Sequence, residues 1–116
     1  MIKEFNLEKR TTEFAKMVIR VCKCLPRNPM NDRLIGQVVG SSGSIGANYR
    51  EANDSLGKKD FLQRLKIAQR EAKETKHWLE LVLEANTNKE TDIIPLIKES
   101  EELIKILSSI IIKIGI

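Results

Sequence analysis

Apolar residues recur at steps of three and four along four stretches of the chain. Short runs rich in Pro, Gly, Asn and Asp separate these stretches and have the composition of turns: LPRNP at 25–29, NDSLG at 53–57 and NTNKETD at 86–92. A period of three to four residues is that of an amphipathic helix. The pattern therefore predicts four helices over roughly 7–25, 29–54, 58–85 and 93–114, with Pro95 at the start of the last.

Each of the first three segments has an apolar face for a common core. In the first segment that face holds Leu7, Thr11, Phe14, Val18, Val21 and Leu25. In the third it holds Phe61, Leu65, Ala68, Ala72, Leu79 and Leu83. One apolar stripe per helix is what a bundle buries, so we expect an all-α, antiparallel, up-down-up-down four-helix bundle. At 116 residues the chain has the size of one domain, 1–116.

The fourth segment has more apolar surface than one stripe. Leu96, Leu103 and Leu107 define the core face, while isoleucines form a second row and add further surface. Surplus apolar surface predicts a face covered by another subunit, and the candidate interface residues are Ile104, Ile106, Ile111 and Ile112. The alternative is a wide core face within a single chain.

The stretch GSSGSIGANYREAN at 40–53 raises the question of a phosphate loop. It lacks G-x-x-x-x-G-K-[ST], and the spacing of Gly40, Gly43 and Gly46 does not match G-x-G-x-x-G. As a helix, by contrast, it aligns an apolar row with a separate stripe of Gly36, Gly40, Gly43 and Ala47. Glycine in a helix costs about 1 kcal/mol relative to alanine, so we expect close approach of a neighbouring helix to offset that cost.

Polar side chains lie between these two rows and look buried, so they predict a structural polar network across the bundle. Its members are Gln37, Ser41, Ser44, Asn48 and Glu51, with Glu71 and Glu74 from the third segment. The same carboxylates could instead form a di-metal site or an acid/base pair. The di-iron pattern of bundles repeats E-x-x-H, whereas this chain has only Glu74 with His77. Cys22 and Cys24 are predicted to be reduced, helix-packed thiols, and we expect no metal and no cofactor.

Charge and hydropathy limit the setting of the molecule. With 41% hydrophobic and 31% charged residues the chain suits a globular soluble fold. No apolar run reaches the roughly 18 residues that a bilayer span requires, and MIKEFNLEKR has no apolar core of a secretory signal. We therefore expect a cytoplasmic protein without membrane contact.

The net charge of +4 is concentrated in two regions. Basic residues line one side of the first segment, namely Lys9, Lys16, Arg20, Lys23 and Arg27. The third segment carries Lys58, Lys59, Arg64, Lys66, Arg70 and Lys73. Such stripes are either an ordinary solvated surface or the contact surface for an anionic partner.

Several motifs stand together in one order: RTTEFA at 10–15, LP at 25–26, QVVGSSGSIGANYREA at 37–52, KKDFLQRLKIA at 58–68 and KETKHWLEL at 73–81. This set resembles the small bacterial four-helix-bundle proteins encoded in intervening sequences of 23S ribosomal RNA genes, over about residues 5–112. The resemblance implies an antiparallel bundle that assembles as a homopentamer. It also implies a distant similarity to the accessory protein of diversity-generating retroelements, a basic pentamer that binds a reverse transcriptase and nucleic acid. For the polar positions it implies packing and polar contact rather than catalysis.

The sequence thus predicts a homo-oligomeric bundle without enzymatic activity or small-molecule substrate, which binds structured RNA or a nucleoprotein through its basic faces. The phosphate contacts would supply affinity but no sequence information. The alternative function is a protein-interaction scaffold or adaptor for a nucleic-acid enzyme, with no direct nucleic-acid contact. An enzyme using Glu51, Glu71 and Glu74 is the third hypothesis, and it requires a metal or an open pocket around a shifted carboxylate.

Overall fold

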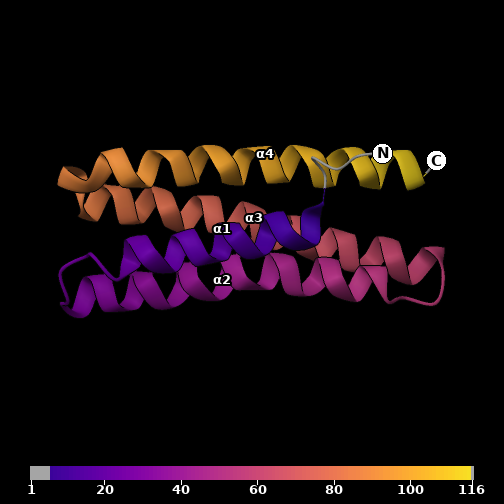
Figure 1. Cartoon of the computed structure of the whole chain (residues 1–116), viewed down its shortest axis with the longest axis horizontal. Coiled ribbons are helices and arrows are strands. Elements are labelled where there is room, and N and C mark those ends of the chain that lie inside the picture. Colours follow the sequence, from indigo (N-terminus) through magenta and orange to yellow (C-terminus); the bar gives the residue numbers. More distant parts are fainter. Residues whose placement is uncertain (1–5, 116) are drawn as a thin grey trace.

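The computed structural model describes residues 6–115 and shows four α-helices that run alternately up and down (Figure 1). They are α1 (Leu7–Cys22), α2 (Pro29–Asn53), α3 (Lys58–Ala85) and α4 (Glu90–Gly115), with a short 3-10 helix η2 (Thr87–Lys89) before α4. The predicted all-α four-helix bundle is confirmed. Over the same residues, no helix is long and apolar enough to cross a bilayer.

The helix starts follow from local chemistry. Asn6 caps α1, since its side-chain oxygen accepts from the backbone N–H of Lys9 at 3.3 Å. Asn28 caps α2 in the same way, accepting from Asn31 N–H at 2.8 Å, and Pro29 takes the first helical position. Gly57 precedes α3 without a side-chain cap.

The start of α4 differs from the prediction. The helix begins at Glu90 rather than near residue 93, so Pro95 is its sixth residue. A proline there removes the hydrogen bond that its N–H would donate to the carbonyl of Thr91. The three residues of η2 shorten the turn, and α4 therefore gains its first turn from residues that the sequence pattern assigned to a loop.

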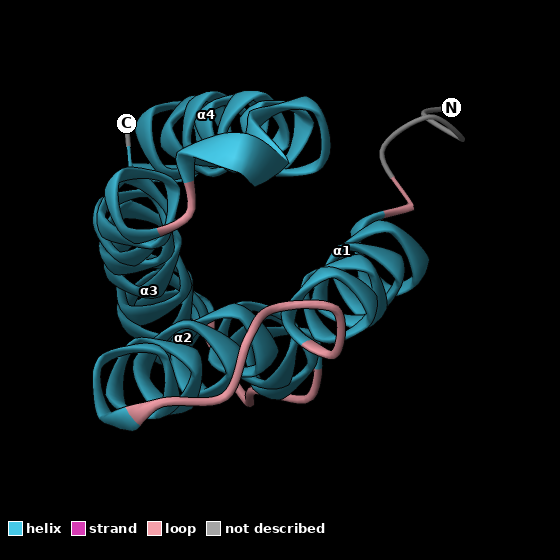
Figure 2. Ribbon diagram, turned by 90° about the vertical axis from the view of Figure 1, so that its left-hand side faces the viewer, coloured by secondary structure: helices cyan, strands magenta, loops and turns pink. Residues whose placement is uncertain are grey.

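Viewed from the end, the helices surround a common centre in the order α1, α2, α3, α4 (Figure 2). The centre is filled by apolar side chains of all four helices, among which Phe14, Ile45, Leu65 and Leu103 are at most 1% exposed. At 16 residues α1 is the shortest helix, while the other three have 25 to 28. Consequently α1 accompanies only part of the length of its neighbours (Figure 1).

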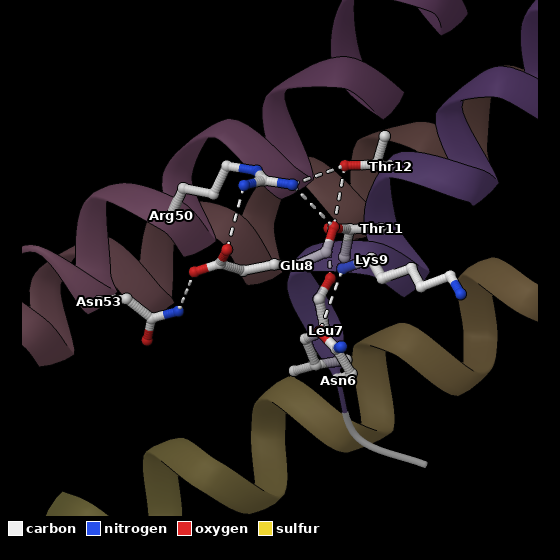
Figure 3. A network of polar contacts seen from close by, with 8 residues as sticks. All are labelled: Asn6, Leu7, Glu8, Lys9, Thr11, Thr12, Arg50 and Asn53. Atoms are coloured by element: carbon white, nitrogen blue, oxygen red, sulfur yellow. Dashed lines mark hydrogen bonds and ion pairs between the residues drawn. The ribbon is translucent and has the colours of Figure 1, made fainter. Parts of the chain in front are cut away.

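Polar contacts fasten α1 to the helices on both sides. Arg10 donates two hydrogen bonds to the carboxylate of Glu99 on α4, at 2.7 and 2.9 Å. On the other side Glu8 accepts from Arg50 at 3.0 Å and from Asn53 at 2.8 Å, and Arg50 also donates to Thr12 at 3.1 Å (Figure 3). These ties connect the first turns of α1 to α2 and α4.

The glycines of α2 differ from the expectation of close packing. A Cβ built on Gly36, Gly40 or Gly43 meets nothing within 4 Å, so no helix of this chain packs against that stripe. The close approach occurs at Gly46, where a Cβ would lie 2.8 Å from Oγ1 of Thr11. The glycine that α1 requires is therefore the one outside the predicted stripe.

Candidate nucleic-acid interface

The basic residues of the first stripe are all exposed, but they are not equivalent. Nζ of Lys16 lies 3.4 Å from Oε2 of Glu13, and Nε of Arg27 lies 2.5 Å from Oδ1 of Asp32. The hydrogen bond to Asp32 raises the pKa of the Arg27 guanidinium. Within residues 6–115, no acid lies within 4 Å of the side-chain nitrogens of Lys9, Arg20 and Lys23.

The second stripe runs along the outer side of α3 and keeps more of its charge. Among residues 6–115, only Arg64 of this stripe has an acidic partner, Glu51 of α2 at 3.5 Å. In the described part of the chain the others have no salt bridge to an acid: Lys58, Lys59, Lys66, Arg70 and Lys73. All five are exposed. Unpaired, solvated cations retain their charge for an anionic partner.

Three of these cations surround a hollow of about 620 Å³ on the outer side of α3. Lys59, Lys66 and Arg70 line it together with Leu62, Gln63 and Ile67. Lys59 and Arg70 are eleven residues apart, about 16 Å along a helix with a rise of 1.5 Å per residue. The hollow combines spaced positive charges with an amide and two half-buried aliphatic side chains. It has no aromatic side chain for base stacking among its lining residues, so it suits backbone phosphates.

The predicted polar network is only partly assembled. Ser41 is buried and accepts a hydrogen bond from Thr75 of α3 at 2.8 Å. Ser44 and Asn48 are half-buried, and each donates to a carbonyl of its own helix, Gly40 at 3.0 Å and Ser44 at 2.9 Å. Gln37 is exposed, contrary to the burial expected from its place beside the core row.

The three candidate carboxylates are not gathered into one site. Glu51 is exposed and pairs with Arg64, while Glu71 and Glu74 are neighbours on α3, half-buried and exposed respectively. Burial raises the pKa of the Glu71 carboxyl, and the charge of Glu74 raises it further. Over residues 6–115, no group of three His, Cys, Asp or Glu side chains is arranged to hold a metal ion.

Most of the surplus isoleucines of α4 pack within the bundle. Ile104, Ile106 and Ile111 are half-buried and pack against the core cluster. Ile112 remains 65% exposed and is the most exposed large apolar side chain of α4. The wide core face therefore accounts for three of the four candidate interface residues, and Ile112 is left as free apolar surface.

The two cysteines have different surroundings. Cys22 is buried, and this burial raises the pKa of its thiol to about 11, whereas Cys24 is exposed. Both are free, but only Cys22 is packed in a helix as predicted, because Cys24 lies in the turn that follows α1.

Two polar clusters were not predicted from the sequence. Asn31 and Asn86, 55 residues apart, exchange side-chain hydrogen bonds of 2.9 and 3.0 Å inside the bundle. The ties of Glu8 to Arg50 and Asn53 join two segments whose partnership the periodicity does not specify (Figure 3). Asn86 begins a predicted turn, where Asn is common for local reasons, and Asn31 falls in the predicted second helix, so nothing marked them as a buried pair.

Taken together, the fold and surface define a four-helix bundle with separated carboxylates and with a basic side of α3 on which all cations but Arg64 lack an ion pair among the described residues. Residues 3–109 match the family model of the 23S rRNA-intervening sequence protein, and the chain belongs to that family. It is also similar to a crystal structure from Bacteroides thetaiotaomicron, described as a protein with unknown function from the S23 ribosomal protein family. That similarity has a TM-score of 0.78 and 33% identity, covering 90% of this chain and 96% of the other. Among curated proteins, none matches this chain.

Proposed function

We propose that this protein binds structured RNA, free or within a nucleoprotein, through the basic outer side of α3. The observation that carries the proposal is the set of three unpaired cations around the α3 hollow, Lys59, Lys66 and Arg70. Exposed positive charge without intramolecular partners contributes little to folding. It can instead release counterions from a phosphate backbone on binding.

We further propose that the protein works by binding and not by catalysis. Glu51 is held by Arg64 on one side, and Glu71 has only another carboxylate, Glu74, and Arg70 as charged influences on its pKa. An acid/base pair would need two carboxyl groups facing a common open space. The hollow on α3 is lined by cations, aliphatic groups and the amide of Gln63, without a carboxylate.

Self-association would multiply this binding surface. The exposed Ile112, beside the half-buried Ile104 and Ile111 on α4, supports a homo-oligomer in which α4 meets another subunit. A ring would present several copies of a modest basic face, and such multivalency strengthens weak contacts. A native mass equal to one chain would contradict this part of the proposal. The variant Ile112→Ser is expected to reduce the mass of the assembly.

The test of RNA binding is fluorescence anisotropy of a labelled ribosomal-RNA hairpin, titrated at about 50 and 200 mM salt. The test variant combines Lys59→Gln, Lys66→Gln and Arg70→Gln. The matched control combines Lys98→Gln, Lys105→Gln and Lys113→Gln on α4, which removes the same charge elsewhere. We expect the test variant to bind more weakly and to lose roughly two to three units of the log–log salt slope, while the control stays close to the unaltered protein.

The alternative function is a protein-interaction scaffold without nucleic-acid contact. It predicts no binding of the hairpin at either salt concentration. Equal weakening in the α3 variant and the α4 control would show that only net charge matters, which would contradict an α3 site. A third variant, Lys9→Gln with Arg20→Gln and Lys23→Gln, measures the share carried by α1.

A further inference from the structure

A second candidate surface lies near the opposite end of the bundle from the α3 hollow, between the C-terminal half of α1 and the N-terminal half of α2 (Figure 1). It is a groove of about 460 Å³ lined by Ile19, Cys22, Ile35 and Val39, with Lys23 and Arg27 at its edge. Ile19 is 43% exposed although it is aliphatic. The groove is therefore a mainly apolar surface that no element of the described chain covers.

The helix surface beside the groove is unusually smooth. Gly36 and Gly40 directly follow the groove residues Ile35 and Val39, and Gly43 comes one turn later on the same side. A Cβ on any of the three meets open space. Each glycine costs about 1 kcal/mol of helix stability relative to alanine, and packing within the chain does not offset that cost. Because these glycines have no side chains, this side of α2 permits the close approach of another helix.

The charges beside the groove that have no ion pair among the described residues are positive. Lys23 lines it, Arg20 is on the outer side of α1, and neither has a salt bridge among the described residues. Arg27 is already paired with Asp32. No carboxylate belongs to the lining. A partner must therefore match apolar side chains in the groove with negative charge at its α1 edge.

We propose that this groove binds an amphipathic helix with an acidic flank, supplied by a partner protein. Apolar side chains at steps of three and four would enter between Ile19, Ile35 and Val39. The backbone of the partner helix would lie over the glycine side of α2, and its acidic flank would face Arg20 and Lys23. A helix suits this surface because the glycines themselves follow steps of four and three, the spacing of ridges and grooves in helix packing. The proposal does not depend on RNA binding at α3.

The test uses two designed helical peptides of about 18 residues, long enough for five turns. They share leucines at steps of three and four and alanines beside them, and they differ only in having glutamates or lysines on the flank. Binding of each labelled peptide to the full chain is measured by fluorescence anisotropy. We expect the glutamate peptide to bind at least about tenfold more tightly than the lysine peptide. Equal binding of the two, or binding of neither, would overturn the proposal.

The decisive variant is Gly40→Leu. Leucine has a much higher helix propensity than glycine and meets open space in the free protein, so we expect a higher melting temperature together with at least about tenfold weaker peptide binding. A role in folding alone would not give opposite changes in stability and binding. The combined Lys59→Gln and Lys66→Gln variant is the control and should bind the peptide normally. A peptide affinity unaltered in Gly40→Leu would contradict docking on this face.

Two other occupants would give different results. If a second copy of this chain covers the groove, the native mass falls in Gly40→Leu and the unaltered protein has no free site for the peptide. If a lipid surface does, vesicles containing an anionic phospholipid bind the unaltered protein but not Gly40→Leu, and the glutamate peptide does not bind. Either result replaces the proposed partner helix.

Discussion

At the scale of single residues, Gly46 is distinct from the other glycines of α2 because α1 crosses directly over it. The Thr11 side chain that it faces is fixed, since Oγ1 of Thr11 donates to the Leu7 carbonyl at 2.5 Å. A methyl group on residue 46 would lie 2.8 Å from this oxygen and 3.3 Å from Cβ of Thr11. Neither atom can move away without loss of the hydrogen bond or a shift of the whole helix.

We therefore expect Gly46→Ala to lower the free energy of unfolding by about 1–3 kcal/mol, the range for overpacking. The matched control is Gly43→Ala on the exposed side of the same helix, where the new methyl meets nothing. That control should gain up to about 1 kcal/mol from helix propensity. Urea unfolding followed by circular dichroism measures both variants. Changes of the same sign in the two would contradict the assignment of Gly46 as the contact glycine.

Glu71 gives a prediction that depends on pH. Burial, followed by the charge of Glu74, raises the pKa of its carboxyl above the ordinary 4.5. The folded state thus holds the proton more tightly than the unfolded chain. The stability associated with the protonated form is complete below the unfolded pKa and is lost as the pH rises through the folded pKa. At neutral pH the charged carboxylate of Glu71 therefore destabilises the folded state.

It follows that Glu71→Gln should unfold at higher urea concentration than the unaltered protein at pH 7 and at a similar concentration near pH 4. Glu80→Gln changes an exposed glutamate of the same helix that has no ion pair within residues 6–115, so it serves as control and should change little. An equal stabilisation at both pH values would indicate that the effect of Glu71 is not electrostatic.

At the scale of helices, the sequence allowed more to be predicted than it did for the candidate site. The ends of α2 and α3 were predicted to within one residue, because Asn28 with Pro29, and Gly57, mark their starts locally. The start of α4 was placed three residues late, because Pro95 was taken to belong to the start of the helix, whereas it is accommodated at the sixth position. A proline near a helix start indicates the region but not the register.

The glycine stripe shows a different kind of error. Gly43 is two residues from both Ser41 and Ile45, which corresponds to about 200° around a helix, so the stripe lies on the side opposite the core row. This phase was readable in the sequence and predicts an exposed stripe. What the sequence does not contain is the line along which α1 crosses α2, and that line alone selects Gly46.

For the basic faces, the sequence supplies the cations but not their partners. Arg64 on α3 is neutralised by Glu51 of α2, whereas Lys66, two residues later, has no partner in the described chain. Their difference depends on which side of α3 faces α2. Composition and spacing alone treat them alike, so only the three-dimensional structure separates the paired from the available charges.

At the scale of the whole molecule, the buried pair of Asn31 and Asn86 joins the first turn of α2 to the turn after α3, at one end of the bundle. Asn31 also donates to the Pro26 carbonyl at 2.8 Å, and Asn86 donates to the Val82 carbonyl at 2.9 Å. The turn between α1 and α2 is thus linked to the end of α3 by a chain of four hydrogen bonds. Each amide satisfies the other, which is why two buried polar side chains are tolerated there.

Removing one asparagine of this pair should therefore lower the free energy of unfolding by more than the loss of its own hydrogen bonds would. Asn86→Ala leaves the amide of Asn31 buried without its reciprocal partner, and we expect a loss of about 1–3 kcal/mol in the free energy of unfolding. Asn31→Ala should cost a similar amount. The double variant should cost clearly less than the sum, because the second removal leaves no stranded group. Chemical denaturation of the unaltered protein, the two single variants and the double variant measures this coupling. Additive losses would mean that the two turns are stabilised independently. If coupling is found, the end of the bundle that holds the α1–α2 groove is a rigid unit, and a partner helix would bind there without first ordering the turn.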